Sequence, residues 1–336
     1  MVEKMNCPIC CDDNWHQTGI RKQDINDPRW KYGYAKTQKK VFFNIWHPNS
    51  SIVVMKRLIC KKCGFVVDHP RPDEKDVYNK YEHLAKVEKH LGSLTTTSKK
   101  ALKQENSQAI EILDLVESYV GNSSKSLDIL DYGGGDGHLM VPMKNKGNNC
   151  YLVDYNKYPV DGITRLGNTL DDVPVNYKFD LIVCRHVLEH VASPKEMIAS
   201  FKGYLKKQGC VYAEVPIQLF GRPKPDGDPV THINFFQEQS FRIMFEAAGF
   251  IPLVSRKKPT SYHGEPMSDK AQILAQKGVN NIKILYKNSY EITKAYMFVS
   301  FLTRLKKKVS NPINFQRYII GRLRYIIRIL KSKLFL

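Results

Sequence analysis

The sequence predicts an α/β fold with a doubly wound, mostly parallel sheet, a small N-terminal module and a C-terminal amphipathic helix. Short apolar runs alternate with helical patterns from residue 126 onward, which is typical of βαβ units. A glycine-rich loop follows the first apolar run, and two C-x2-C pairs stand within the first 63 residues. With 336 residues and 42% hydrophobic content, the chain is long enough and apolar enough to bury a core.

Four cysteines indicate that residues 1–72 form a zinc-binding module. They stand in two C-x2-C pairs, Cys7 with Cys10 and Cys60 with Cys63. Two thiolates three residues apart on a tight turn reach one tetrahedral ion, and two such turns supply the four sulfur ligands of a structural Zn²⁺ site. The alternatives are unligated thiols and a redox pair, although neither pair opens a helix in a βαβ context. Alternating residues predict strands over 41–47 and 51–60 inside this module.

Residues 73–125 are expected to form a helical connector that covers the site. A helix over 73–87 begins with acidic residues, directly after prolines at positions 70 and 72. A second helix is predicted over 99–120, where apolar residues recur on one stripe: Ala109, Ile112, Leu113, Val116 and Val120.

Residues 126–255 are expected to form the core of the fold. The predicted strands run over 127–131, 150–154, 179–185, 210–215 and 250–254, and helices are predicted from about 138, over 194–205 and over 237–249. Residues 256–302 are expected to be an accessory region that faces the substrate, with 256–290 loosely structured.

A nucleotide-binding loop is predicted where the first strand of this core ends. Its pattern is D-x-G-x-G-x-G, with Asp131 followed by Gly133, Gly135 and Gly137. Glycines at such a turn let a ligand approach the main-chain N–H groups closely. The dinucleotide pattern G-x-G-x-x-G is broken at His138, and a carboxylate before the first glycine repels a pyrophosphate but suits a cationic amino-acid ligand. Asp154 ends the next strand, where a carboxylate can accept two hydrogen bonds from a ribose diol.

Three further segments follow the loop in order: FDLIVCRHVLEH at 179–190, LKKQGCVYAEVP at 205–216 and VTHINFF at 230–236. Together with the loop, they resemble the class I S-adenosylmethionine-dependent methyltransferases over about residues 127–254. The resemblance implies a Rossmann-like sheet and an enzyme that uses S-adenosylmethionine.

The same resemblance implies a cofactor site. Asp131 and the three loop glycines would contact the methionine part of S-adenosylmethionine, and Asp154 would bind the ribose hydroxyls. Asn168 stands where the family often has an aspartate that contacts adenine. Its amide oxygen can still accept a hydrogen bond from the adenine amine.

The N-terminal module resembles one group within these methyltransferases. The segment CKKCGFVV at 60–67, followed by Pro70-Arg71-Pro72, is similar to the zinc-binding front of deoxysugar C-methyltransferases and related surface-glycan methyltransferases. It implies a sugar or glycan acceptor and a tyrosine that closes over the site, matched by Tyr78 or Tyr81. The second nucleotide fold of the C-methyltransferases is missing, so we expect O-methylation of a sugar of a bacterial surface glycan or of its nucleotide-linked precursor. C-methylation of a nucleotide-linked keto-deoxysugar is the alternative.

Three histidines are candidates for the base of this reaction: His232, His186 and His190. A hydroxyl must lose its proton as the methyl group arrives, which suits an imidazole. We prefer His232, because its segment resembles the stretch that holds the base in the sugar methyltransferases. His186 and His190 are four residues apart, so they are expected on one face of a helix at the mouth of the sheet.

The positive charge is concentrated at the C-terminus. The formal net charge is +19, yet residues 303–336 hold ten Lys or Arg residues and no acid. The rest of the chain shows no basic platform interleaved with aromatic residues, so nucleic acid is not an expected partner. An RNA methyltransferase and a non-catalytic adaptor with the same fold remain as further alternatives.

Residues 303–336 are expected to form a basic amphipathic helix. Apolar residues recur at helical spacing after Pro312: Phe315, Ile319, Leu323, Ile326, Ile327 and Leu330. Such a helix suits either an anionic membrane surface or a packing site on this chain or another subunit. We expect the membrane, because lipid-linked glycans are assembled there. With no apolar run long enough to span a bilayer and no secretory signal, the expected location is cytoplasmic, peripheral on the inner face of the membrane.

Overall fold

The computed structural model describes residues 5–31, 35–91, 99–120, 126–219, 230–259, 261–262, 265–266, 269–278, 284, 286 and 288–298. The chain divides into two compact units, residues 1–290 and residues 291–336. The elements below belong to the first unit, and the tail predicted over 303–336 lies outside the described residues.

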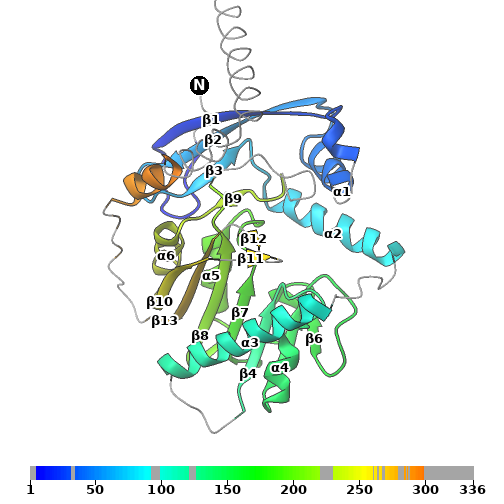
Figure 1. The fold of residues 1–336 in the computed structure, drawn as a ribbon, viewed down its shortest axis with the longest axis vertical. Helices are drawn as coiled ribbons and strands as arrows, with labels where there is room; N and C mark the ends of the chain where they lie inside the picture. Colours follow the sequence, from blue (N-terminus) through cyan, green and yellow to red (C-terminus); the bar gives the residue numbers. More distant parts are fainter. Residues whose placement is uncertain are drawn as a thin grey trace, which may run out of the picture. The chain divides into compact units, whose positions relative to one another are not determined.

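A seven-stranded sheet forms the core (Figure 1). Its spatial order is β10 (Phe250–Lys258), β13 (Lys270–Lys277), β8 (Leu205–Pro216), β7 (Phe179–Arg185), β4 (Asp128–Tyr132), β5 (Asn149–Val153) and β6 (Thr164–Gly167). The ladders β8–β7–β4–β5–β6 are parallel, and β13 runs antiparallel to both of its neighbours. The predicted doubly wound, mostly parallel sheet is confirmed.

Helices cover both faces of this sheet. On one face, α3 (Lys99–Val120) and α4 (Met140–Asn145) pack on alternate strand residues such as Ile129 and Tyr212. On the other face, Tyr132 contacts Phe201 at the end of α5 (Pro194–Phe201), and α5 packs against α6 (Glu238–Ala247). The predicted strands and helices of residues 126–255 are present, with ends that differ by a few residues.

The expectation of loose structure over 256–290 is wrong. β13 lies inside the sheet between β8 and β10, and its residues 271–275 are buried. The polar Gln272 interrupts the apolar pattern of this strand, yet it is buried because its side-chain amide donates to Tyr212 Oη and to Glu214 Oε2. The partners that bury β13 come from 60 or so residues earlier in the chain, so no local pattern reveals them.

The N-terminal module is built on a second sheet. Its antiparallel order is β1 (Trp15–Asp24), β2 (Ile52–Cys60), β3 (Val66–His69) and β9 (Asn234–Phe235). β9 belongs to the segment between β8 and α6, so hydrogen bonds of one sheet join the module to the core.

The strand predicted over 51–60 is confirmed as β2, but the one over 41–47 is wrong. Residues 35–40 form α1 (Ala35–Lys40), which continues into a π-helical turn over Val41–Trp46. Phe42 and Trp46 are four residues apart and pack on one side, where Phe42 also stacks on Trp30. β2 pairs with β1 and with β3; the residues of β1 are mostly polar, and only one of them is buried, so β1 shows no alternation.

Both helices predicted in the connector are present, as α2 (Glu74–Leu91) and α3. The remaining short elements are helical turns at Pro28–Lys31 and Leu170–Asp172, and the strands β11 (Ser261–Tyr262) and β12 (Glu265–Pro266). Among the described helices, none combines the length and the apolar character needed to cross a membrane.

Candidate active site

The glycine loop folds back onto the end of β5. Gly133, Gly135 and Gly137 all have positive φ angles, of 74°, 64° and 84°. The Gly133 N–H donates to the Val153 carbonyl over 2.8 Å, and the Gly135 N–H donates to Asp154 Oδ2 over 2.9 Å. A Cβ atom at Gly133 would lie 2.4 Å from Val187 Cγ2, so no larger residue fits there. The structure therefore brings the predicted loop and Asp154 together.

Asp131 lies beneath this loop as a buried carboxylate. Its exposed fraction is 2%, and its Oδ2 atom has no hydrogen-bond partner among the described residues. Burial raises the pKa of Asp131 to about 7; Arg185 opposes this rise, and the neighbouring carboxylates of Asp154, Glu105 and Asp136 add to it. A ligand that carries an ammonium group would pair with this carboxylate, which fits the predicted amino-acid ligand.

Asp154 and Asn168 lie at the ends of the neighbouring strands β5 and β6. Arg165 links them, because its guanidinium donates to the Asp154 carbonyl over 2.8 Å and to Asn168 Oδ1. The Asp154 carboxylate accepts the N–H groups of Gly135 and Asn156, and each of its oxygens keeps a second lone pair for a hydroxyl.

A cavity of about 230 Å³ borders Thr169, the residue after Asn168. It is lined by Tyr132, by Thr169–Asp171 and by the first turns of α5, among other residues. The cavity lies next to the residue at which the resemblance expects adenine.

The segment after β7 is a turn, so the expectation that His186 and His190 share a helical face is wrong. His186 has a φ of 55°, and its N–H donates to the Glu214 carbonyl over 3.0 Å, which extends the β7–β8 pairing. The next side chain, Val187, fills the space above Gly133. These two contacts turn the chain away from the helical path.

His186 is held between two buried carboxylates. Its Nδ1 atom lies 3.4 Å from Glu189 Oε1, its Nε2 atom lies 3.4 Å from Glu214 Oε1, and 41% of its side chain is exposed. Burial opposes the charged imidazole, but Glu189 and Glu214 outweigh this effect and raise the pKa of His186.

Glu214 is itself the centre of a charged network. It accepts hydrogen bonds from Arg185 over 2.9 Å and from Lys270 over 2.7 Å. Burial works against its ionisation, but His186, Arg185 and Lys270 outweigh that cost and hold the pKa of Glu214 well below its usual range. Glu214 is therefore an anion that orients His186.

His190 and His232 contact each other, with ring centroids 4.6 Å apart. His190 Nδ1 lies 3.0 Å from the Thr231 carbonyl oxygen, and His232 Nδ1 lies 2.7 Å from Gln218 Oε1. Burial, together with the cationic Lys80 and with His232, holds the pKa of His190 well below its usual value. All three predicted histidines thus gather near the carboxyl ends of β7 and β8.

The sequence reasoning missed three charged residues of this site: Glu189, Glu214 and Lys80. Glu189 lies inside the quoted segment at 179–190, and Glu214 interrupts an apolar strand, which is an unusual place for a charge. Lys80 is only 2% exposed on α2, whose pattern is otherwise that of a surface helix.

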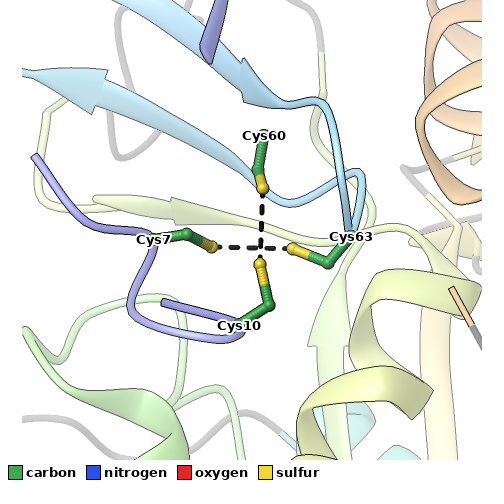
Figure 2. Close-up of side chains that lie close together, drawn as sticks. All are labelled: Cys7, Cys10, Cys60 and Cys63. Carbon is green, nitrogen blue, oxygen red and sulfur yellow. Dashed lines mark hydrogen bonds between the residues drawn. The ribbon is translucent and has the colours of Figure 1, made fainter. Parts of the chain in front are cut away.

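The four predicted cysteines meet in the N-terminal module, and all four are free thiols (Figure 2). The Sγ atoms of Cys7 and Cys63 are 3.5 Å apart, as are those of Cys10 and Cys60, and all four lie within 4.8 Å of one another. A tetrahedral zinc with Zn–S bonds of about 2.3 Å needs sulfur atoms roughly 3.8 Å apart, so the set fits that ion. The Cys11 N–H donates to the Cys7 carbonyl and the Gly64 N–H to the Cys60 carbonyl, which closes each pair into a tight turn.

Comparison with known proteins matches residues 103–253 to a family described as a methyltransferase domain. A ubiquinone biosynthesis O-methyltransferase of Rickettsia conorii is 23% identical, over 51% of this chain and 64% of that protein. One of Actinobacillus pleuropneumoniae is 33% identical, over 25% of this chain and 43% of that protein. The chain thus matches less than two thirds of the length of these curated relatives.

Solved structures with a similar fold are more distant. The 1,6-didemethyltoxoflavin-N1-methyltransferase of Burkholderia thailandensis, with bound S-adenosylhomocysteine, has a TM-score of 0.47 and 17% identity, over 66% of this chain and 96% of that one. The magnesium protoporphyrin IX methyltransferase of Synechocystis has a TM-score of 0.40 and 16% identity, over 60% and 97%.

The family match and the sheet order agree on the same part of the chain. Residues 103–253 include the five parallel strands, the glycine loop and the three histidines. They form a methyltransferase domain.

Proposed function

We propose that the chain transfers a methyl group from S-adenosylmethionine to a hydroxyl oxygen of a sugar, in a bacterial surface glycan or in its nucleotide-linked precursor. The observation that carries this proposal is the position of His186. Its imidazole is partly exposed and held by Glu214, and the next residue, Val187, packs on Gly133 of the cofactor loop. This position would place a base beside the bound methyl donor.

The cofactor contacts follow from the loop geometry. Asp131 would pair with the ammonium group of the methionine part, and the loop glycines, which have no side chains, would let that part of the cofactor approach the backbone. Asp154 would accept hydrogen bonds from the ribose hydroxyls, and Asn168 would face the adenine.

The reaction needs alignment and a base. The acceptor oxygen attacks the methyl carbon, the S–CH₃ bond breaks with its electron pair remaining on sulfur, and the hydroxyl proton passes to an imidazole. Of the three candidates, His186 fits this role better than His232, because His232 is bonded to Gln218 and contacts the ring of His190. O-methylation is supported over C-methylation by the names of the curated relatives, which are O-methyltransferases.

We further propose that Cys7, Cys10, Cys60 and Cys63 hold one structural Zn²⁺. The support is the donor set of four thiols and its spacing. An ion bound there would fix the N-terminal segment to the turn between β2 and β3, with no part in the chemistry.

The membrane proposal rests on the sequence of residues 303–336. Its basic, acid-free amphipathic pattern supports attachment to an anionic membrane surface, which would bring the enzyme to lipid-linked acceptors.

Two measurements test the proposed function. Mass spectrometry of the purified protein should detect co-purified S-adenosylmethionine or S-adenosylhomocysteine. Release of S-adenosylhomocysteine should then be screened against nucleotide sugars and lipid-linked glycans, with intermediates of ubiquinone biosynthesis as the competing acceptor class. Turnover of those intermediates alone would contradict a sugar acceptor.

A further inference from the structure

A second group of metal-ligand side chains lies beside His186. Glu189, His190 and His232 each offer one ligand atom, and these atoms lie within 4.8 Å of one another. The planes of the two imidazoles are inclined at 73°, so the rings are not stacked. Two imidazoles and one carboxylate are a donor set that suits divalent first-row transition metals.

An oxygen acceptor lies beside the Nδ1 atom of each histidine. The Thr231 carbonyl next to His190 Nδ1 can only accept, and so can Oε1 of Gln218 next to His232 Nδ1. An imidazole that donates its Nδ1–H to such an oxygen offers the lone pair on Nε2 to a metal ion. Metal-ligating histidines usually donate their other N–H to an oxygen in this way.

Glu189 supplies the negative charge. It is 1% exposed, and within the described part of the chain neither of its carboxylate oxygens has a hydrogen bond. The imidazole of His186, 3.4 Å away, is its ion-pair contact. A carboxylate this deeply buried is ordinarily paired or bound to a metal ion.

Lys80 is a buried cation at the edge of the group. Its Nζ atom lies 3.4 Å from His190 Nδ1, the nitrogen that a metal ion would not use. The positive charge of Lys80 would repel a metal ion, so we expect the site to bind that ion with only moderate affinity.

We propose that Glu189, His190 and His232 bind one divalent transition-metal ion, through the carboxylate and the two Nε2 atoms. Three protein ligands leave coordination positions open for an oxygen of another molecule. The role of the ion, unlike its site, rests on the proposed function: it would hold the acceptor hydroxyl and lower its pKa, and His186 would take the proton.

Mn²⁺ is a suitable probe, because it favours oxygen and nitrogen ligands and competes poorly for the four-cysteine site. In a titration of the zinc-loaded protein followed by electron paramagnetic resonance, about one Mn²⁺ should bind per chain. Glu189→Gln and His232→Ala should each weaken Mn²⁺ binding by at least about 10-fold. Loss of a residue that merely supports a metal ligand already costs about 10–100-fold in affinity. Glu196→Gln on α5 and His16→Ala on β1 are matched controls and should keep the wild-type affinity.

The proposal is overturned if the wild-type protein binds no Mn²⁺ at millimolar concentration, or if Glu189→Gln binds it as the wild type does. Calorimetry with S-adenosylhomocysteine separates this result from the proposed function. Unchanged binding of that ligand by both variants shows that they are folded, so that their loss of Mn²⁺ supports the site. If the wild-type protein binds Mn²⁺ but no S-adenosylhomocysteine, the proposed function fails while the metal site stands.

Discussion

Folding encloses the carboxylate of Asp131 without giving its Oδ2 atom a partner among the described residues. An exposed aspartate has a pKa of about 3.9, whereas burial raises that of Asp131 to about 7. Near neutral pH the ligand-free fold therefore contains a buried negative charge that Arg185 only partly offsets. A cationic ligand would remove this cost, so the residue proposed to bind the cofactor destabilises the ligand-free protein.

The Asp131→Asn variant should therefore be more stable than the wild type in the absence of ligand. Between pH 4 and pH 7 the unfolded carboxyl is ionised while the folded one stays protonated, so wild-type stability falls as pH rises through that window. The advantage of the variant should grow over the same window and stay constant above about pH 7. Melting temperatures from pH 4 to pH 8 measure it, and an equal difference at all pH values would contradict the burial of an ionisable Asp131.

His186→Ala should lower turnover by about 10²–10⁴-fold, the usual contribution of a positioned general base. Binding of S-adenosylhomocysteine should persist, since His186 lies outside the glycine loop. The rate of S-adenosylhomocysteine release with an identified acceptor is the measurement. If His186→Ala turns over almost normally, His186 is not the base, and His232, which the resemblance first implied, becomes the candidate again.

At the scale of elements, the sequence predicts those parts whose pattern is local. The strands β4, β5, β7 and β8 are short apolar runs, and the loop after β4 needs glycines because its φ angles are positive. The burial of β13 is not evident from the sequence, because it depends on pairing with β8, which lies 54 to 66 residues earlier in the chain. The sequence of Val41–Trp46 predicts a strand, because aromatic residues occur in strands as well as in helices. The segment is a helical turn, in which Phe42 packs on Trp30.

In the candidate site, too, the residues with a local sequence pattern could be predicted, whereas those that depend on long-range contacts could not. Asp131, the loop glycines and Asp154 could be found because each stands at a strand end, where parallel strands deliver residues to one edge. The roles of Glu189 and Glu214 could not, because they depend on the left-handed turn at His186 and on pairing between β7 and β8. The four cysteines could be paired in advance because a tetrahedral ion explains both spacings at once.

Zinc binding by the four cysteines can be tested directly. Elemental analysis should find about one zinc per chain in the wild type, and the Cys60→Ser/Cys63→Ser double variant should lose it. Because zinc would hold the N-terminal segment against the β2–β3 turn, removal by a chelator should lower the melting temperature. Cys184→Ser, at a buried cysteine of β7 far from the cluster in sequence, is the control and should keep its zinc. A metal-free wild type that is fully folded would refute the site.

At the scale of the whole molecule, the N-terminal module and the methyltransferase domain share contacts around the histidines. Arg57 forms a bidentate ion pair with Asp68 and also donates to the Leu219 carbonyl. Arg71 donates to the Ala192 carbonyl and to Asn234, two residues beyond His232. The module therefore contacts the chain on both sides of His232, at Leu219 and at Asn234, so its loss should lower the stability of this part of the fold.

The C-terminal tail is the part of the chain that should decide where the enzyme works. Residues 303–336 hold ten basic residues and no acid, so their attraction to anionic lipid should be strong at low salt and weaken as salt is added. Deleting them should release the protein from anionic liposomes in a flotation assay. Binding of S-adenosylhomocysteine should be unchanged, because residues 1–290 form a separate compact unit. Neutral liposomes provide the control, and a full-length protein that ignores anionic liposomes at low salt would show that the tail packs on protein instead.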